Sequence, residues 1–159
     1  VEVVRVGSAR EMLTAVETAL PTDAAIFAAA VADWRVKSAS DKKLKKTKGG
    51  MPALEFEENP DILATVSKLA EGRPGLVVGF AAETDDVIEN ATSKRQRKGC
   101  DWIVANDVSP ETGIMGGTEN KIHLVTANGV EDWPRLTKVE TARRLAVRIA
   151  DTLAPKSAR

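Results

Sequence analysis

Three runs of apolar residues, each followed by polar residues, set the pattern of the chain. They cover residues 24–30, 76–82 and 102–105 and consist mainly of Val, Ile and Ala. Continuous apolar runs of this length favour strands that are buried on both faces of a parallel sheet. Helical patterns separate the runs, and strand–helix–strand order favours right-handed crossovers between parallel strands.

Shorter stretches alternate between apolar and polar positions. Residues 1–6 are rich in Val and predict a strand, and residues 54–57 predict a second short one. Residues 121–126 and 130–133 flank the dipeptide Asn128-Gly129, which is a strong signal for a two-residue hairpin turn. We therefore expect an antiparallel hairpin in the C-terminal half.

Four segments have the spacing and the end signals of helices. Capping boxes open two of them, at Ser8–Glu11 and at Thr137–Glu140. Asn59 is the expected N-cap of a third helix. Thr84 or Asp85 is the expected N-cap of a fourth, which ends before Gly99. The segments cover residues 8–20, 59–69, 85–98 and 137–153. Their expected apolar faces include Met12, Leu13, Val16 and Leu20 in the first, and Ala142, Leu145, Ala146, Ile149 and Leu153 in the last.

Residues 33–53 are polar, rich in Lys, and contain Gly49, Gly50 and Pro52, which predicts a long loop or flap. Together the elements predict one α/β domain: a three-layer, Rossmann-like, mostly parallel sheet with an antiparallel hairpin extension. The hairpin could cover a sheet edge or pair with another subunit.

Composition narrows the functional classes. The 23 basic and 23 acidic residues balance, so net charge does not point to nucleic acid. A single cysteine, Cys100, excludes an intrachain disulfide framework, and we expect it to be buried rather than reactive. No apolar run approaches the roughly 20 residues of a membrane span, and no secretory signal is evident. We expect a cytoplasmic protein that binds neither membranes nor nucleic acid.

Polar residues at the predicted strand ends are the first candidates for chemistry, because ligands of open α/β sheets bind beyond the carboxyl ends of the strands. Asp33 follows the first apolar run and is either a turn acid or a carboxylate that binds a ribose or an amine. Asn106 and Asp107 form either a turn or a polar site wall. Phe80 is by default a core residue, and in the minority interpretation it contacts a base.

Basic residues form two local groups. Lys43, Lys45 and Lys46 lie in the predicted loop, where they are either solvated charges or cations that close on phosphates. Lys94 and Lys98 share a helical face near a helix C-terminus, where they also stabilise the dipole. His123 is by default a surface or interface residue. The chain has no zinc-ligand spacing, Walker A sequence or G-x-G-x-x-G motif, so a nucleotide would be bound in another way.

Taken in order, the motifs resemble phosphopantothenoylcysteine synthetase, the ligase half of the bacterial bifunctional coenzyme A biosynthesis flavoprotein. The resemblance covers nearly the whole chain. It rests on residues 28–35 (AAAVADWR), 43–46 (KLKK), 59–63 (NPDIL), 78–84 (VGFAAET), 94–98 (KRQRK), 105–109 (ANDVS) and 119–121 (ENK).

The resemblance implies a ligase that joins 4′-phosphopantothenate to cysteine. CTP activates the carboxylate as an acyl-cytidylate with magnesium present, and the cysteine amine then displaces CMP. It also implies that Lys43 stabilises charge at the reacting centre. The implied nucleotide-binding residues are Phe27, Ala28, Ala29, Asp33, Pro60, Asp61, Ile62, Leu63 and Phe80, with Lys94 and Lys98 on the phosphates; Lys45, Lys46, Asn106 and Asp107 are possible site walls, and the metal ligands are unknown.

The resemblance further implies a homodimer, and our hypothesis is that the hairpin at residues 121–133 forms its interface. It also implies a fused or associated phosphopantothenoylcysteine decarboxylase, whose FMN lies outside this chain. The family's glycine-rich segment has no counterpart here, so we expect a domain at 1–154 without that N-terminal strand and loop, and a tail at 155–159. Two alternatives stay open: a catalytically incomplete fragment that binds CTP or dimerises, and, more weakly, an NAD(P)-dependent oxidoreductase.

Overall fold

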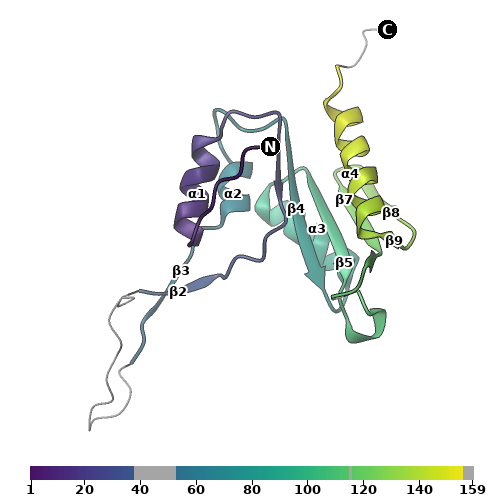
Figure 1. Cartoon of the computed structure of the whole chain (residues 1–159), viewed down its shortest axis with the longest axis horizontal. Coiled ribbons are helices and arrows are strands. Elements are labelled where there is room, and N and C mark those ends of the chain that lie inside the picture. The colour runs from purple at the N-terminus through teal and green to yellow at the C-terminus, as the bar shows by residue number, and fades with distance from the viewer. Residues whose placement is uncertain (38–52, 115, 156–159) are drawn as a thin grey trace. The chain divides into compact units, whose positions relative to one another are not determined.

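A computed structural model describes residues 1–37, 53–114 and 116–155 (Figure 1). The chain divides into two compact units. The smaller comprises Val1–Thr18 and Ala30–Ile62, and the larger comprises Ala19–Ala29 and Leu63–Arg159.

The larger unit contains most of the regular structure. Its elements are β1 (Ala24–Phe27), α2 (Ile62–Ser67, whose first residue belongs to the smaller unit), β4 (Leu76–Glu83), α3 (Val87–Lys98), β5 (Trp102–Asp107), the 3-10 helix η1 (Pro110–Thr112), β6 (Glu119–Asn120), β7 (Ile122–Thr126), β8 (Gly129–Asp132), β9 (Leu136–Thr137) and α4 (Lys138–Leu153). The smaller unit contains α1 (Ala9–Thr18), β2 (Trp34–Val36) and β3 (Phe56–Glu58).

Five strands of the larger unit form one mixed sheet in the order β1-β4-β5-β7-β8. The β1–β4 and β4–β5 pairs are parallel, and the β5–β7 and β7–β8 pairs are antiparallel. Figure 1 shows β4 and β5 side by side, with α4 beside the β7–β8 end of the sheet. The expected α/β fold with a hairpin extension is confirmed, with the hairpin built into the sheet itself.

Strand alternation divides the core between the two faces of this sheet. On one face, Leu145 of α4 packs into a cluster with Val78, Trp102 and Leu124. On the other face lie Val77 and Ile103, which are fully buried. Here α3 packs against β4, β5 and β7, and Leu63 of α2 reaches Gly79. Helices therefore cover both faces, which confirms the three-layer arrangement.

Side-chain stacking over the sheet helps to hold α4. The guanidinium carbon of Arg144 lies 4.6 Å from the centre of the Trp133 ring, and that of Arg148 lies 5.4 Å from the Trp102 ring. Arg148 also pairs with Glu131 at 2.7 Å. The capping box predicted at Thr137 and Glu140 is present at the N-terminus of α4.

The smaller unit contains a two-stranded hairpin whose faces differ in chemistry. β2 and β3 pair antiparallel, with Trp34 opposite Glu58 and Val36 opposite Phe56. This places Trp34, Val36 and Phe56 on one face, and Trp34 and Phe56 are more than half exposed. The other face carries the Arg35–Glu57 ion pair at 3.0 Å, and Lys37 lies 3.5 Å from Glu55.

Several predictions for this part of the chain were wrong. Residues 1–6 do not form a strand, and their valines are exposed; a strand needs a partner for its backbone hydrogen bonds. The predicted loop at 33–53 instead begins with β2, which pairs with β3.

The predicted first helix is confirmed as α1, with Met12, Leu13 and Val16 half-buried.

Other corrections concern boundaries and burial in the larger unit. β1 is shorter than predicted and lies at the sheet edge in the described chain, so Ile26 is 51% exposed rather than buried. The helix expected from residue 59 begins only at Ile62. Asp86, not Thr84 or Asp85, is the N-cap of α3, whereas the predicted C-terminal stop at Gly99 is confirmed by its φ of 75°.

The predicted hairpin turn is displaced by one residue. The turn residues are Ala127 and Asn128, and Thr126 pairs with Gly129. The Asn128 N–H donates to Thr126 Oγ1 at 3.1 Å, and Gly129 takes a φ of 124° directly after the turn. In α4, the prediction held for Leu145 and Ile149, but Ala142 and Ala146 are exposed.

Cys100 is buried as expected, and burial raises the pKa of its thiol.

Within the described ranges, no helix combines the length and the apolar character needed to cross a membrane.

Candidate functional site at the carboxyl ends of the strands

The larger unit brings several predicted site residues to one edge of its sheet. Asn106 and Asp107 are the last two residues of β5, whereas Phe80 is the fifth of the eight residues of β4. In the parallel register, Ala82 is opposite Asn106 and Glu83 is opposite Asp107. This is the edge at which open α/β sheets bind ligands.

Alternation places these residues on opposite faces of the sheet. Phe80 and Asn106 point to the face covered by α4, and Phe80 packs against the buried cluster there. Phe27, opposite Gly79, and Asp107 point to the face covered by α2 and α3. Ala28 and Ala29 follow β1 and are exposed. The predicted nucleotide-binding residues therefore do not all lie on one face.

Gly79 allows α2 to approach the sheet closely. A Cβ at this position would lie 2.6 Å from Leu63 Cδ2 and 2.8 Å from Ile103 Cδ1, closer than side-chain atoms can pack. A larger residue would displace Leu63, which is one of the predicted nucleotide-binding residues. Gly79 thus fixes the position of the start of α2 on the sheet.

The loop after β5 is held by its own hydrogen bonds. Asp107 Oδ1 accepts a hydrogen bond from the Ser109 N–H at 2.8 Å, and Thr112 Oγ1 donates to the carbonyls of Asp107 and Ser109. The hydrogen bonds from Ser109, with smaller contributions from the charges of His123 and Lys121, keep the pKa of Asp107 below its ordinary value. Asp107 is therefore an ionised carboxylate at the carboxyl edge.

Lys94 and Lys98 lie on α3, and both are half-buried. α3 runs back toward the amino end of β5, because only residues 99–101 connect Lys98 to Trp102. Lys98 is therefore near the opposite end of the strands from Asn106 and Asp107. The described chain does not bring Lys98 together with the polar carboxyl edge.

The remaining candidates belong to the smaller unit or lie outside the described residues. Asp33 is exposed and directly precedes β2, and its carbonyl accepts a hydrogen bond from the Asn59 N–H at 2.7 Å. Asn59, which was expected to cap a helix, instead donates from Nδ2 to the Ala32 carbonyl at 2.8 Å. After it come Pro60, Asp61 and the buried Ile62. Lys43, Lys45 and Lys46 fall outside the described residues.

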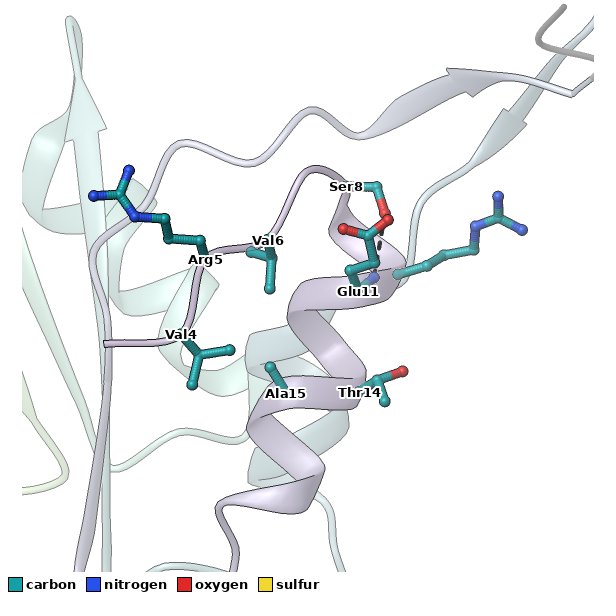
Figure 2. Close-up of a pocket in the computed structure, with 8 residues that line it drawn as sticks. Val4, Arg5, Val6, Ser8, Glu11, Thr14 and Ala15 are labelled. Carbon is teal, nitrogen blue, oxygen red and sulfur yellow. Dashed lines mark hydrogen bonds between the residues drawn. The ribbon is translucent and has the colours of Figure 1, made fainter. Parts of the chain in front are cut away.

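Figure 2 shows a separate shallow hollow in the smaller unit. It lies between the N-terminal segment and α1, and Val4, Val6, Glu11 and Ala15 are among the residues that line it. None of the residues predicted from the sequence to form the site lines this hollow.

Sequence reasoning missed a histidine–aspartate pair near the carboxyl edge. His123 of β7 is directly opposite Asp132 of β8, and His123 Nδ1 contacts Asp132 Oδ1. Ala105 of β5 is the partner of His123 on its other side. The signal available in the sequence was the hairpin spacing, since a turn at residues 127–128 places these two residues opposite each other.

A protein-built magnesium site is not found in the described part of the chain. No group of three or more His, Cys, Asp or Glu side chains is arranged there to hold a metal ion. The described residues therefore do not fit a magnesium ion held by protein ligands alone.

The comparisons with known proteins agree on one family. Residues 1–153 match the model of the DNA/pantothenate metabolism flavoprotein C-terminal domain. The coenzyme A biosynthesis bifunctional protein CoaBC of Vibrio parahaemolyticus is 43% identical over 131 residues, which cover 81% of this chain and 33% of that protein. A cysteine/cysteine sulfinic acid decarboxylase from an unknown prokaryotic organism is 40% identical over 144 residues, 89% of this chain and 40% of that protein.

A solved structure supports the same assignment. The crystal structure of the C-terminal domain of CoaBC superposes with a TM-score of 0.72 at 35% identity, covering 94% of this chain and 65% of that chain. The chain thus spans about a third of the length of the Vibrio relative and about two thirds of the solved domain. The chain belongs to the DNA/pantothenate metabolism flavoprotein C-terminal domain family, the phosphopantothenoylcysteine synthetase part of bifunctional CoaBC proteins.

Proposed function

We propose that this chain catalyses the CTP-dependent joining of 4′-phosphopantothenate and cysteine in coenzyme A biosynthesis. The observation that carries the proposal is the 43% identity over 131 residues with the CoaBC protein of Vibrio parahaemolyticus. The reaction has two steps: the carboxylate attacks the α-phosphorus of CTP and releases pyrophosphate, and the amine then attacks the acyl-cytidylate and releases CMP.

This chemistry needs positioning and charge stabilisation more than a protein nucleophile. We assign the nucleotide to Phe27–Ala29, Asp33, Pro60–Leu63 and Phe80. Its phosphates are assigned to Lys94 and Lys98, and this part of the proposal rests on the resemblance alone, because Lys98 lies near the amino end of β5. In this proposal Lys43 stabilises charge at the reacting centre. The possible site walls are Lys45, Lys46, Asn106 and Asp107, of which Asn106 and Asp107 are the last two residues of β5.

The partners proposed for the whole protein follow from the relatives. The Vibrio relative is a bifunctional protein. This supports a fused or associated phosphopantothenoylcysteine decarboxylase, which would act on the product of the ligase. We further propose a cytoplasmic homodimer in which the β7–β8 hairpin lies at the interface. Disrupting β8 should then abolish the dimer, and an unchanged dimer in sedimentation would contradict this assignment.

The first test measures pyrophosphate release from CTP. It should require 4′-phosphopantothenate, and CMP release should additionally require cysteine. Because one relative carries the name of a different decarboxylase, the assay omits each substrate in turn. The proposal would be contradicted if pyrophosphate were released without phosphopantothenate, or if no pyrophosphate were released with all substrates present.

The second test concerns the lysine assigned to the reacting centre. Lys43→Gln removes the cation and should lower the rate of pyrophosphate release about 100- to 1,000-fold, as does the loss of one preorganised stabilising group. The matched control is Lys37→Gln, which removes a surface lysine whose side chain is 59% exposed and lies 3.5 Å from Glu55. A Lys43→Gln variant with the wild-type rate would exclude the assigned role.

A second candidate function is CTP binding or dimerisation without complete catalysis. It is favoured by one observation, namely that the chain covers 65% of the solved C-terminal domain. Calorimetry that detects CTP binding, in a chain that releases no pyrophosphate with all substrates present, would select this candidate. Turnover in an N-terminally extended version would then show that catalysis needs residues outside this chain.

A further inference from the structure

One ionisable pair near the carboxyl edge has no role in the proposal above. His123 and Asp132 are cross-strand partners in β7 and β8, and Asp132 Oδ1 contacts His123 Nδ1. An ionised carboxylate can only accept hydrogen bonds, so the imidazole donates from Nδ1. This fixes the tautomer and leaves a lone pair on Nε2 when the ring is neutral.

The second ring nitrogen, Nε2, is not engaged by Asp132. Among the described residues, Asp132 is the hydrogen-bond partner that the ring has, and it occupies Nδ1. The His123 side chain is 16% exposed. The ring is thus held at Nδ1, and Nε2 is the nitrogen that could accept a proton.

The pair lies on the same sheet face as Asp107. His123 is opposite Ala105, and Ala105 precedes Asp107 by two residues on β5, about 7 Å along a strand. The charges of His123 and Lys121 contribute to the lowered pKa of Asp107, which agrees with this proximity. Ala81 and Ala105, the neighbours of His123 in the same row of the sheet, have small side chains.

We infer that His123 Nε2 is the general base of the amide-forming step and that Asp132 is its positioning residue. The inference rests on the proposed ligase function. The amine nitrogen of cysteine forms the new bond to the acyl carbon, and the bond between that carbon and the cytidylate oxygen breaks. CMP leaves with the electron pair, and the proton lost by the amine moves to Nε2. The carboxylate of Asp132 stabilises the imidazolium that forms.

The first step, by contrast, needs no base of this kind. Its attacking group is a carboxylate that is already ionised at neutral pH, and its leaving group is pyrophosphate. Loss of the imidazole should therefore separate the two steps, whereas a purely structural role of the pair would affect both steps alike through the fold.

The test measures the two steps separately on the full-length protein, in a single turnover with CTP and phosphopantothenate. His123→Gln should release pyrophosphate within about twofold of the wild-type rate. Its amide formation after addition of cysteine should be about 100- to 10,000-fold slower, the usual contribution of a general base. Asp132→Asn should slow amide formation by about 10- to 100-fold, as is typical when a carboxylate that orients a functional histidine is lost.

Glu131→Gln is the matched control. Glu131 is the neighbour of Asp132 on β8, pairs with Arg148 of α4, and points to the other face of the sheet. Its variant should leave the ratio of the two rates unchanged. The inference would be overturned if His123→Gln and Asp132→Asn lowered the rates of pyrophosphate release and of amide formation equally. It would also be overturned if a folded Asp132→Asn variant formed the amide at the wild-type rate. A wild-type protein that releases no pyrophosphate would instead contradict the proposed ligase function.

Discussion

The five-stranded sheet and the β2–β3 hairpin differ in how far their apolar side chains are covered. In the sheet, Val77 and Ile103 are fully buried, because helices cover both faces. In the hairpin, Trp34 is 57% and Phe56 is 58% exposed. A two-stranded hairpin is at best marginally stable in water, whereas a covered sheet gains from burial on both faces.

The hairpin compensates for missing burial with polar contacts. Arg35 Nη1 donates to the Glu58 carbonyl at 2.7 Å, while its other terminal nitrogen pairs with Glu57. Asn59 links the segments next to β2 and β3 through Ala32 and Asp33. Stability in the larger unit is thus set by packing, and in the smaller unit by hydrogen bonds and ion pairs. Substitutions in the two units should therefore have very different costs.

The largest difference is expected for removal of apolar side chains. Ile103→Ala should lower the free energy of unfolding by about 2–5 kcal/mol, because it leaves a cavity between β4 and α3. Phe56→Ala should cost no more than about 1 kcal/mol, since most of the ring is already in water. Urea denaturation of the two variants measures both values. Equal costs would show that the apolar face of the hairpin is covered in solution.

The next effect tests close packing in the sheet. Gly79→Ala should cost about 1–3 kcal/mol, because the new methyl group overlaps Leu63 and Ile103. Combining it with Leu63→Ala should recover part of the loss, since the double variant provides the missing space. The matched control is Gly72→Ala, where no atom lies within 4 Å of the added carbon and only the φ of 69° opposes it. A purely additive double variant would contradict the proposed contact.

How far the sequence predicted the fold depended on what surrounds each element. The patterns at residues 76–82 and 102–105 gave β4 and β5, because strands covered on both faces have continuous apolar sequences. The same reasoning was wrong about the burial of β1, because the pattern cannot reveal that a strand lies at an edge. It also failed for residues 1–6, since alternation shows β propensity but not whether a partner strand is present.

The site was predictable only where its residues end a strand. Asn106 and Asp107 could be assigned to the carboxyl edge from the apolar run before them, whereas Phe80 lies in the middle of β4. The His123–Asp132 pair was missed because the turn was predicted one residue too late, a shift that would place Pro134 opposite His123. The roles of Lys43, Lys94 and Lys98 stay predictions, as they rest on the resemblance and not on described contacts.

A smaller effect compares the helix caps of the two units. Thr137 Oγ1 accepts a hydrogen bond from the Glu140 N–H at 3.1 Å, and Thr137→Ala should cost about 0.5–2 kcal/mol. Ser8 Oγ accepts from the Glu11 N–H at 3.2 Å in the same way, but α1 has no fully buried residue. We expect Ser8→Ala to lower the global stability less than Thr137→Ala. The reverse order in thermal unfolding would show that α1 is part of the cooperative core.

The smallest effect concerns the ion pair that links β8 to α4. The hydrogen bond from Arg148 keeps the pKa of Glu131 below its ordinary value, so folding favours the ionised carboxylate. The contribution is therefore fully present above the unfolded pKa of about 4.3 and is lost as the pH falls through the lower folded value. Because both side chains are more than a third exposed, Glu131→Gln should cost only about 0.2–1 kcal/mol at pH 7.

The difference between wild type and Glu131→Gln should accordingly shrink as the pH is lowered below 4.3, which urea denaturation at several pH values measures. Lys37→Gln is the comparison from the smaller unit, where the Lys37 and Glu55 side chains are 59% and 75% exposed and should contribute close to zero at any pH. A pH-independent cost for Glu131→Gln would mean that Glu131 acts through packing. In that case ion pairs would not distinguish the two units, and burial alone would account for the contrast between them.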